Sequence, residues 1–271
     1  MPALYVVATP VGNLEDVTLR ALRILKEVKL IAAEDTRKTR KLLSAYDIHT
    51  PTTSYHEHNK LVKLDYILDY LEHADVALVS DAGMPGISDP GYELISSVIR
   101  HNIRVVPIPG PSALISALVV SGLPTDKFVY LGFLPHKTGE RRSLLKARAD
   151  EKSSLVVFES PHRLRVSLKD MFSILGDRRV AISRELTKIH EEVFRGKLSE
   201  AIEHFSSPKG EFTLVVSGSE EKALPELNAD VESLLREFRN SGATAKAAIG
   251  QIAGETGLSK RALYEAWIKL K

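Results

Sequence analysis

Three loops rich in glycine and proline have the residue types that could bind a small ligand. They span residues 9–13, 80–85 and 109–113, and each follows a short apolar run that is typical of a buried strand. Ligands bind outside the carboxyl ends of the strands in an open parallel sheet, so we expect these loops to line one cleft at one edge. Each loop alone could be only a tight connection, but three together favour a binding site. We expect the backbone around Gly83 and Gly110 to approach the ligand closely.

The charges near these loops indicate what the ligand is. The loops contain no lysine or arginine, whereas Asp81, Asp89 and Glu34 follow strand-like runs. No loop has the Gly-Lys-Ser/Thr of a Walker motif or the Gly-x-Gly-x-x-Gly of a dinucleotide site. A nucleoside without phosphates, with a cationic centre and a ribose diol, suits such a rim better than ATP does, and S-adenosylmethionine fits that description. We predict that the following residues bind this cofactor: Thr9, Pro10, Gly12, Asn13, Ser80, Asp81, Ala82, Gly83, Pro85, Pro109, Gly110, Ser112 and Ala113.

The elements that position these loops follow from hydrophobic periodicity. Strands are predicted at 4–8, 30–33, 76–79 and 104–108, and helices at 19–28, 61–71, 94–99 and 112–122. Strands that alternate with helices predict a parallel sheet with helices on its faces. The predicted first domain, residues 1–124, is therefore an α/β domain that binds the cofactor.

The rest of the chain divides into two further predicted parts. Residues 125–220 form a second α/β domain that completes the cleft, and its sheet is partly antiparallel because residues 192–196 lie too close to their neighbours for helical crossovers. Residues 225–271 form a helical tail with the rhythm of a helix-turn-helix, in which Ser259 is a candidate N-cap. This tail could contact nucleic acid or serve only in packing or dimerisation.

Composition excludes several classes of protein. The chain has 271 residues, of which 44% are hydrophobic, enough for real cores, and it has no cysteine. Disulfides, thiolate metal sites and a cysteine nucleophile are therefore excluded. No apolar stretch approaches the roughly 18 residues of a membrane span, and no signal peptide precedes the first strand. We expect a soluble cytoplasmic protein with no membrane partner and no metal.

Cations gather in three segments although the net charge is only +2. The segments are residues 37–41, 137–148 and 246–271. Such clusters could follow the phosphate backbone of a nucleic acid, or each could be a solvated helix face.

Eight blocks of consecutive residues resemble sequences of the tetrapyrrole methylase superfamily and, within it, of the bacterial branch that methylates ribosomal RNA. The blocks run in order along nearly the whole chain: ATPVGNL at 8–14, AAEDTR at 32–37, VSDAGMP at 79–85, DPG at 89–91, PIPGPSA at 107–113, GFLP at 132–135, ESPHR at 159–163 and RELTK at 184–188. Asn13 agrees with the ribosomal branch, because relatives that modify tetrapyrroles usually carry an acidic residue there. Met84 departs from the threonine of many members.

The resemblance implies a homodimer of two α/β domains with S-adenosylmethionine between them. It also implies 2′-O-methylation of a cytidine in the decoding region of small-subunit ribosomal RNA, as free RNA or in the assembled subunit. The cations predicted to contact this RNA are Arg37, Arg40, Arg141, Arg142 and Arg163. The alternatives are methylation of a small tetrapyrrole-like substrate, which the same fold would allow, and RNA binding without catalysis.

A ribose hydroxyl is a poor nucleophile, so methyl transfer to it needs proton removal, stabilisation of the developing alkoxide, or both. Glu159 and Glu185 each follow a predicted strand of the second domain, and Lys188 lies three residues beyond Glu185. These three residues are the catalytic candidates. The alternative is that they form an ion pair between the domains that only holds the cleft closed.

Overall fold

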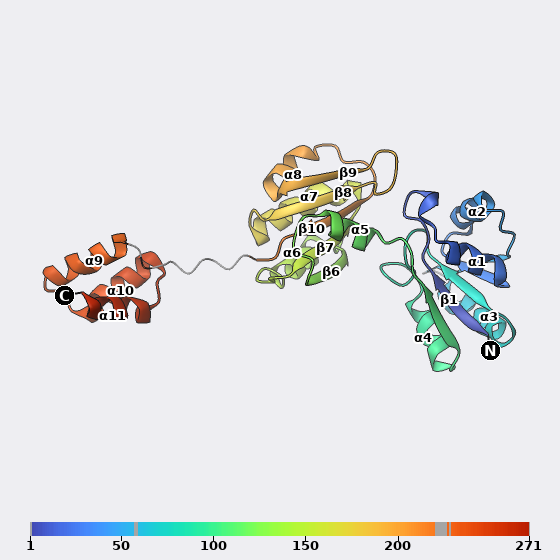
Figure 1. Cartoon of the computed structure of the whole chain (residues 1–271), viewed down its shortest axis with the longest axis horizontal. Helices are drawn as coiled ribbons and strands as arrows, with labels where there is room; N and C mark the ends of the chain where they lie inside the picture. The colour runs from blue at the N-terminus through green and yellow to red at the C-terminus, as the bar shows by residue number, and fades with distance from the viewer. Residues whose placement is uncertain (1, 57–58, 220–226, 228, 271) are drawn as a thin grey trace. The chain divides into compact units, whose positions relative to one another are not determined.

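The computed structural model describes residues 2–56, 59–219, 227 and 229–270 (Figure 1). The chain divides into two compact units, Met1–Ser219 and Glu220–Lys271. The first unit contains two five-stranded sheets, and the described part of the second contains helices.

The first sheet is parallel, as predicted, and has the strand order β3-β2-β4-β1-β5. Every residue of β2 and β4 is buried, because helices cover both faces of the sheet. The strands are β1 (Ala3–Val7), β2 (Leu30–Ala33), β3 (Thr52–Ser54), β4 (Val76–Val79) and β5 (Arg104–Ile108). The helices that connect them are α1 (Leu19–Glu27), α2 (Thr36–Ala45), α3 (Lys60–His73) and α4 (Tyr92–Arg100), and a short 3-10 helix (Leu14–Asp16) precedes α1.

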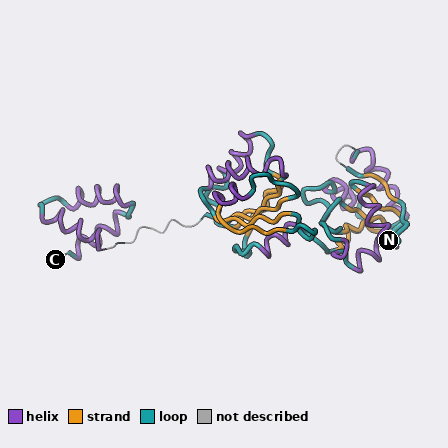
Figure 2. The backbone as a smooth tube through the Cα atoms, turned by 90° about the horizontal axis from the view of Figure 1, so that it is seen from above, coloured by secondary structure: helices purple, strands orange, loops and turns teal. Residues whose placement is uncertain are grey.

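The second sheet has the order β6-β7-β10-β8-β9 and mixes directions as predicted. Strands β6 and β7 are parallel, whereas β10 is antiparallel to both of its neighbours and β9 is antiparallel to β8. The strands are β6 (Phe128–Phe133), β7 (Ser154–Glu159), β8 (Arg179–Arg184), β9 (Glu192–Lys197) and β10 (Phe212–Val216). Helices α6 (Thr138–Lys146), α7 (Pro161–Leu175) and α8 (Leu198–His204) share one core with this sheet. Figure 2 shows the strands of both sheets in orange and the helices in purple.

Helix α5 (Ala113–Val120) links the two sheets in an unexpected way. It follows β5 of the first sheet, and the Ser112 side chain caps it by accepting from the amide of Ile115. Its Leu114, Ala117 and Leu118 nevertheless pack on the second sheet. A helix inside the predicted first domain therefore belongs to the packing of the second sheet, and the boundary at residue 124 stays a prediction.

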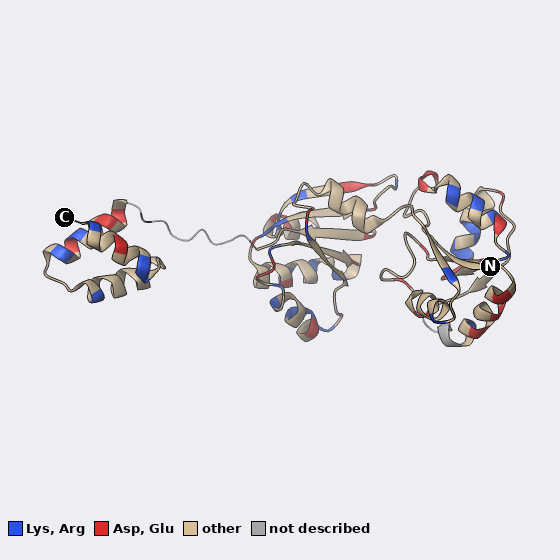
Figure 3. Cartoon of the chain, turned by 60° about the horizontal axis from the view of Figure 1, so that its bottom comes forward, with Lys and Arg blue, Asp and Glu red and all other residues tan. Residues whose placement is uncertain are grey.

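The second unit has its own small core of three helices, α9 (Ala229–Asn240), α10 (Ala245–Thr256) and α11 (Lys260–Lys269). Ser259 caps α11 as predicted, because its side chain accepts from the amide of Ala262 at 3.1 Å. The predicted start of the tail at residue 225 lies outside the described residues. Figure 3 colours the lysine and arginine positions of these helices blue. Lys246, Lys260 and Arg261 are exposed.

Within the described residues, no helix is both long enough and apolar enough to span a bilayer.

Candidate ligand-binding cleft

A cleft of about 410 Å³ lies at the carboxyl ends of the first sheet and is completed by the second sheet. All three predicted loops reach it, through Val11, through residues 81–84 and through residues 112–114. The loops are tied to one another, because the backbones of Thr9 and Gly83 exchange two hydrogen bonds of 2.9 Å. The prediction that the loops meet at one edge and line one cleft is therefore confirmed.

The predicted cofactor residues fall into two groups. The residues that line the cleft are Asp81, Ala82, Gly83, Ser112 and Ala113. The others lie behind the lining: Thr9 donates from Oγ1 to the carbonyl of Ser80 at 3.1 Å, and Asn13 caps the 3-10 helix. The amide and carbonyl of Gly83 are both bonded to Thr9, and the contact of this backbone with the cofactor stays a prediction. Gly83 has a φ of 79°, so glycine is needed there for the turn itself.

The wall that the first sheet contributes is acidic. Asp89 and Glu34 line the cleft with Asp81, whose Oδ2 pairs with the Lys38 ammonium at 2.6 Å. Burial raises the pKa of Asp89 to about 7, and the neighbouring charges of Glu34 and Asp81 add to the shift. Burial also raises the pKa of Glu34. Carboxylates crowded in this way favour a ligand that brings positive charge.

This electrostatic arrangement predicts how cofactor binding depends on pH. Raising the pH through about 7 ionises Asp89, so we expect affinity for the sulfonium of S-adenosylmethionine to rise between about pH 6 and pH 8. Because the folded pKa lies above the unfolded value, Asp89 also makes the fold less stable as the pH rises from about 4 to about 7. Isothermal titration calorimetry of the wild type and of Asp89→Asn would measure the first effect. The variant should bind more weakly with a flatter profile, and an unchanged profile would contradict the assignment.

The second sheet contributes the other wall of the cleft, and four of the residues in this wall were not predicted. These are Phe133, Phe158, Ser183 and Thr213, which lie on the strands of this sheet. Ser183 is 1% exposed, and its Oγ has no hydrogen-bond partner in the described structure. A buried hydroxyl without a partner is costly, so this atom fits a polar group of a bound ligand. Of the four, only Phe133 belonged to a recognised sequence block, GFLP, and nothing in that block assigned it a role.

Glu159, a predicted catalytic residue, lines the cleft and is held there by several hydrogen bonds. Its carboxylate is fully buried and accepts from Arg163 Nη2 at 2.6 Å, from Ser167 Oγ at 2.6 Å and from the amide of Ser160 at 2.8 Å. A carboxylate held by this many donors stabilises the start of α7. The assignment of Glu159 as a catalytic residue stays a prediction. Arg163 pairs with this carboxylate and its side chain is 17% exposed, and its role as an RNA contact stays a prediction.

Glu185 and Lys188 pair with each other but do not line the cleft. The Lys188 ammonium lies 2.9 Å from Glu185 Oε1 and 3.0 Å from Glu211 Oε2. Burial opposes both charges, but these hydrogen bonds outweigh it, raising the pKa of Lys188 and lowering that of Glu185. The ion pair lies within the second-sheet half, so the alternative of a pair between the domains is also wrong. Lys188 contacts the first-sheet half by packing against the loop after β1, since a Cβ on Gly12 would lie 2.5 Å from Lys188 Cγ.

The predicted RNA contacts on α6 are corrected in part. Arg141 is 3% exposed, and its guanidinium pairs with Asp170 at 2.7 Å and donates to the carbonyls of Pro135 and His136. It therefore cannot reach a phosphate. Arg142 pairs with the same carboxylate, but its side chain is 56% exposed. Arg37 and Arg40 lie exposed on α2. This helix begins just after the carboxyl end of β2, so its start lies near the cleft.

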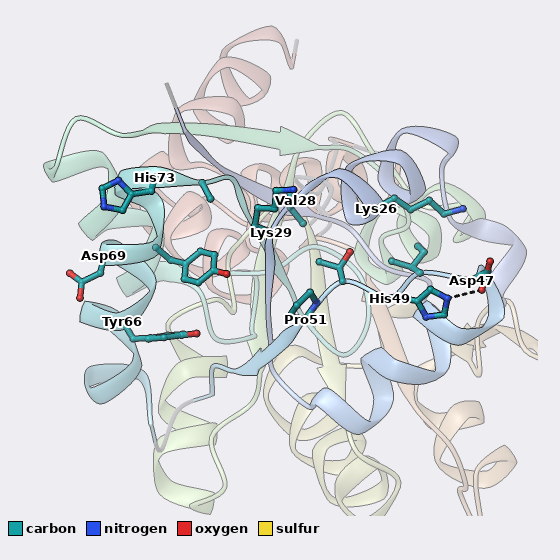
Figure 4. A pocket seen from close by; sticks show the side chains of 13 residues that line it. Lys26, Val28, Lys29, Asp47, His49, Pro51, Tyr66, Asp69 and His73 are labelled. Carbon is teal, nitrogen blue, oxygen red and sulfur yellow. Dashed lines mark ion pairs between the residues drawn. The ribbon is translucent and has the colours of Figure 1, made fainter.

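A larger hollow, of about 1020 Å³, lies at the opposite edge of the first sheet (Figure 4). It is built from the ends of α1 and α3 and the loop before β3. Lys26, Lys29, His49 and Tyr66 are among the residues that line it. The carboxyl ends of three helices converge here, and their unpaired carbonyls disfavour anions. None of the glycine-rich loops contributes to it, so it is not the predicted site.

Comparisons with known proteins agree with this geometry. Residues 3–202 match the profile of the family described as Tetrapyrrole (Corrin/Porphyrin) Methylases. Proteins named Ribosomal RNA small subunit methyltransferase I are similar over nearly the whole chain: one from Halalkalibacterium halodurans is 50% identical over 97% of this chain and 94% of its own length. One from Synechocystis sp. is 46% identical over 100% of this chain and 99% of its own. One from Thermotoga maritima is 53% identical, and 81% of this chain matches its whole length.

Two solved structures share the fold. Uroporphyrin III C-methyl transferase from Thermus thermophilus has a TM-score of 0.58 at 20% identity, covering 79% of this chain and 97% of that chain. A putative diphthine synthase from Entamoeba histolytica has a TM-score of 0.61 at 16% identity, covering 82% of this chain and 95% of that chain. The predicted fold class is thus confirmed.

Proposed function

Because the chain belongs to the tetrapyrrole methylase family, in its ribosomal RNA small subunit methyltransferase I branch, we propose that it methylates small-subunit ribosomal RNA. The methyl donor is S-adenosylmethionine, and the acceptor is the 2′-oxygen of a cytidine ribose in the decoding region. The observation that carries the proposal is the 50% identity, over 97% of this chain, to a protein of that name. The site of action that follows is the cytoplasm, where ribosomes are assembled.

The residues of the cleft fit S-adenosylmethionine. When bound, this cofactor supplies an electrophilic methyl group on a positively charged sulfur. The acidic groups of Glu34, Asp81 and Asp89 suit that charge, and the unpartnered hydroxyl of Ser183 can bond to a polar group of the ligand. The small side chain of Ala113 leaves room at the wall. We propose that the cleft-lining residues of the three loops contact the cofactor and that the remaining predicted loop residues hold those loops in place.

For the methyl-transfer step, we propose that positioning of the ribose hydroxyl contributes most of the rate enhancement. The hydroxyl must lie in line with the sulfur–methyl bond, and correct orientation alone can account for a large part of a rate enhancement. Leu186, in the loop between Glu185 and Lys188, lines the cleft. The Glu185–Lys188 pair fixes this loop, whose Glu185 and Thr187 have φ values of 50° and 65°. In this proposal the pair positions the cleft wall.

Contacts with the RNA backbone are proposed for the exposed cations. Arg37 and Arg40 on α2 and the exposed part of Arg142 remain candidates. Lys260 and Arg261 at the start of α11 add a second candidate surface on the helical unit. The Thermotoga maritima relative matches 81% of this chain over its whole length, a share similar to that of the first unit. We therefore place methyl transfer in the first unit and an accessory role in the second.

A homodimer is also proposed, and α5 provides the surface. Ile115 and Val119 lie one turn apart on this helix and are 48% and 71% exposed, next to Val120 at 39%. Adjacent exposed apolar side chains of this kind are typical of an interface. We expect sedimentation velocity to give twice the chain mass, and Val119→Glu to shift the protein toward the monomer. Val62→Glu, at an 81% exposed position on α3, is the matched control, and a monomeric wild type would contradict the proposal.

The experiment that tests the function compares acceptors. The protein is incubated with S-adenosylmethionine labelled in the methyl group and with one of three acceptors: assembled small subunits, free small-subunit RNA, or a reduced tetrapyrrole. Label in either RNA acceptor supports the proposal and identifies the form of the substrate. Label only in the tetrapyrrole supports the alternative enzyme, and cofactor binding without transfer supports a non-catalytic RNA-binding protein.

A further inference from the structure

Phe133 is a large apolar side chain that the fold leaves uncovered inside the cleft. It lies at the carboxyl end of β6, lines the cleft, and is 54% exposed. The other end of the same strand begins with Phe128, which does not line the cleft. Phe133 therefore exposes an aromatic face where a ligand would lie.

The backbone around Phe133 is shaped to hold it there. A β-bulge shifts the register of β6 against β7 between Tyr130 and Gly132, and Gly132 has a φ of 63°. Bulges bend a strand locally and are frequent next to active sites, where they re-aim a side chain. A Cβ on Gly132 would lie 3.1 Å from Ser88 Oγ, which itself lies 2.5 Å from the Tyr130 hydroxyl. The bulge is thus fixed against the first-sheet half of the cleft.

Two further rings support Phe133 from behind. Phe158 lies opposite it in register on β7, with ring centroids 5.7 Å apart and an edge-to-face angle of 61°. Tyr130 also packs edge-to-face against Phe158, with centroids 5.3 Å apart. Edge-to-face packing fixes the plane of a ring, and Phe133 keeps 54% of its surface exposed for a stacking partner.

We infer that Phe133, supported by Phe158, is the platform on which the base of the target nucleotide stacks. The inference rests on the proposed function and adds to it the surface that holds the acceptor. Proteins recognise single-stranded RNA bases by stacking them on aromatic side chains.

The charges of the cleft support a base rather than a phosphate at this wall. Among the described lining residues, Lys38 is the only cation, and its ammonium is paired with Asp81. Glu34, Asp81, Asp89 and the glycine-rich loops, which suit the sulfonium of the cofactor, lie on the first-sheet side, whereas the aromatic surface belongs to β6 and β7. We therefore place the positively charged end of the cofactor against the first-sheet wall and the acceptor base against the aromatic surface of the second.

The test compares Phe133→Leu with Phe133→Tyr and with the control Phe128→Leu on the same strand. For the RNA acceptor we expect Phe133→Leu to lower kcat/KM by about tenfold or more, the size of one lost stacking contact. Phe133→Tyr should retain activity within about twofold, because it keeps the ring, and Phe128→Leu should behave as the wild type. Affinity for S-adenosylmethionine, measured by calorimetry, should stay the same in all three variants.

Three results would overturn the inference. Unchanged kcat/KM in Phe133→Leu would show that no base stacks there. A parallel loss of cofactor affinity would assign the ring to S-adenosylmethionine instead. Equal losses in the Leu and Tyr variants would show that stacking is not the cause. Failure of the proposed function is separate, because then the wild type itself would transfer no methyl group to the RNA.

Discussion

We expect Arg141→Met to lower the free energy of unfolding by about 3–5 kcal/mol. The change removes one partner of a buried ion pair and leaves the carboxylate of Asp170, whose side chain is only 4% exposed, with a single cation. It also deprives the carbonyls of Pro135 and His136 of the donor that they share. Breaking a buried pair from one side is far more costly than losing a pair at the surface, because a desolvated charge remains.

Urea unfolding followed by circular dichroism measures this loss. Arg142→Met is the matched control, since Arg142 donates to the same carboxylate from a half-exposed position, and it should cost about 1 kcal/mol or less. The pKa of Asp170 is lowered, since the bonds from Arg142 and Arg141 outweigh the effect of burial, so the contribution of the pair should disappear as the pH falls through the acid range. A stable Arg141→Met protein with a flatter salt dependence of RNA binding would instead restore the phosphate role for Arg141.

Gly12→Ala is expected to lower the affinity for S-adenosylmethionine by about tenfold or more. A Cβ at this position would lie 2.5 Å from Lys188 Cγ, 2.7 Å from the Leu186 carbonyl oxygen and 2.9 Å from Thr187 Oγ1. One of these atoms belongs to the backbone, so the whole loop must move, and overpacking of this kind costs about 1–3 kcal/mol. Because Leu186 lines the cleft, the displacement opens the ligand site.

Calorimetric titration of Gly12→Ala with the cofactor measures this effect. Gly139→Ala is the control, because a Cβ there meets nothing within 4 Å and the position lies in α6. The control should bind as the wild type does. Wild-type affinity in Gly12→Ala would show that the loop of residues 185–188 has no part in shaping the cleft.

The parts of the fold that could be predicted are those with a local signal. Strands such as β2 and β4 are continuous apolar runs, and the loops after β1, β4 and β5 carry their glycines and prolines within a few residues. Their meeting at one edge follows from the parallel topology alone. Strand β3 and helix α2 were not predicted, because β3 has only three half-buried polar residues and α2 opens with the polar sequence TRKTRK.

The sequence could predict only those parts of the site whose residues lie together within a single loop. Arg141 resembles any cation of a basic helix, and only Asp170, 29 residues further on, makes it a buried residue. Glu159 resembles a free carboxylate until Ser167, two turns along α7, is placed against it. Phe133 and Ser183 come to the cleft through strand pairing across the second sheet, and long-range pairing has no local signature in the sequence.

The most direct measurement is the identity of the methylated nucleoside. Small ribosomal subunits that lack the methyl group are incubated with the protein and labelled S-adenosylmethionine, and the RNA is digested and resolved by mass spectrometry. The account predicts one methyl group per subunit, recovered as 2′-O-methylcytidine from the decoding region. Label on a base, at many positions or on no RNA nucleoside at all would contradict it.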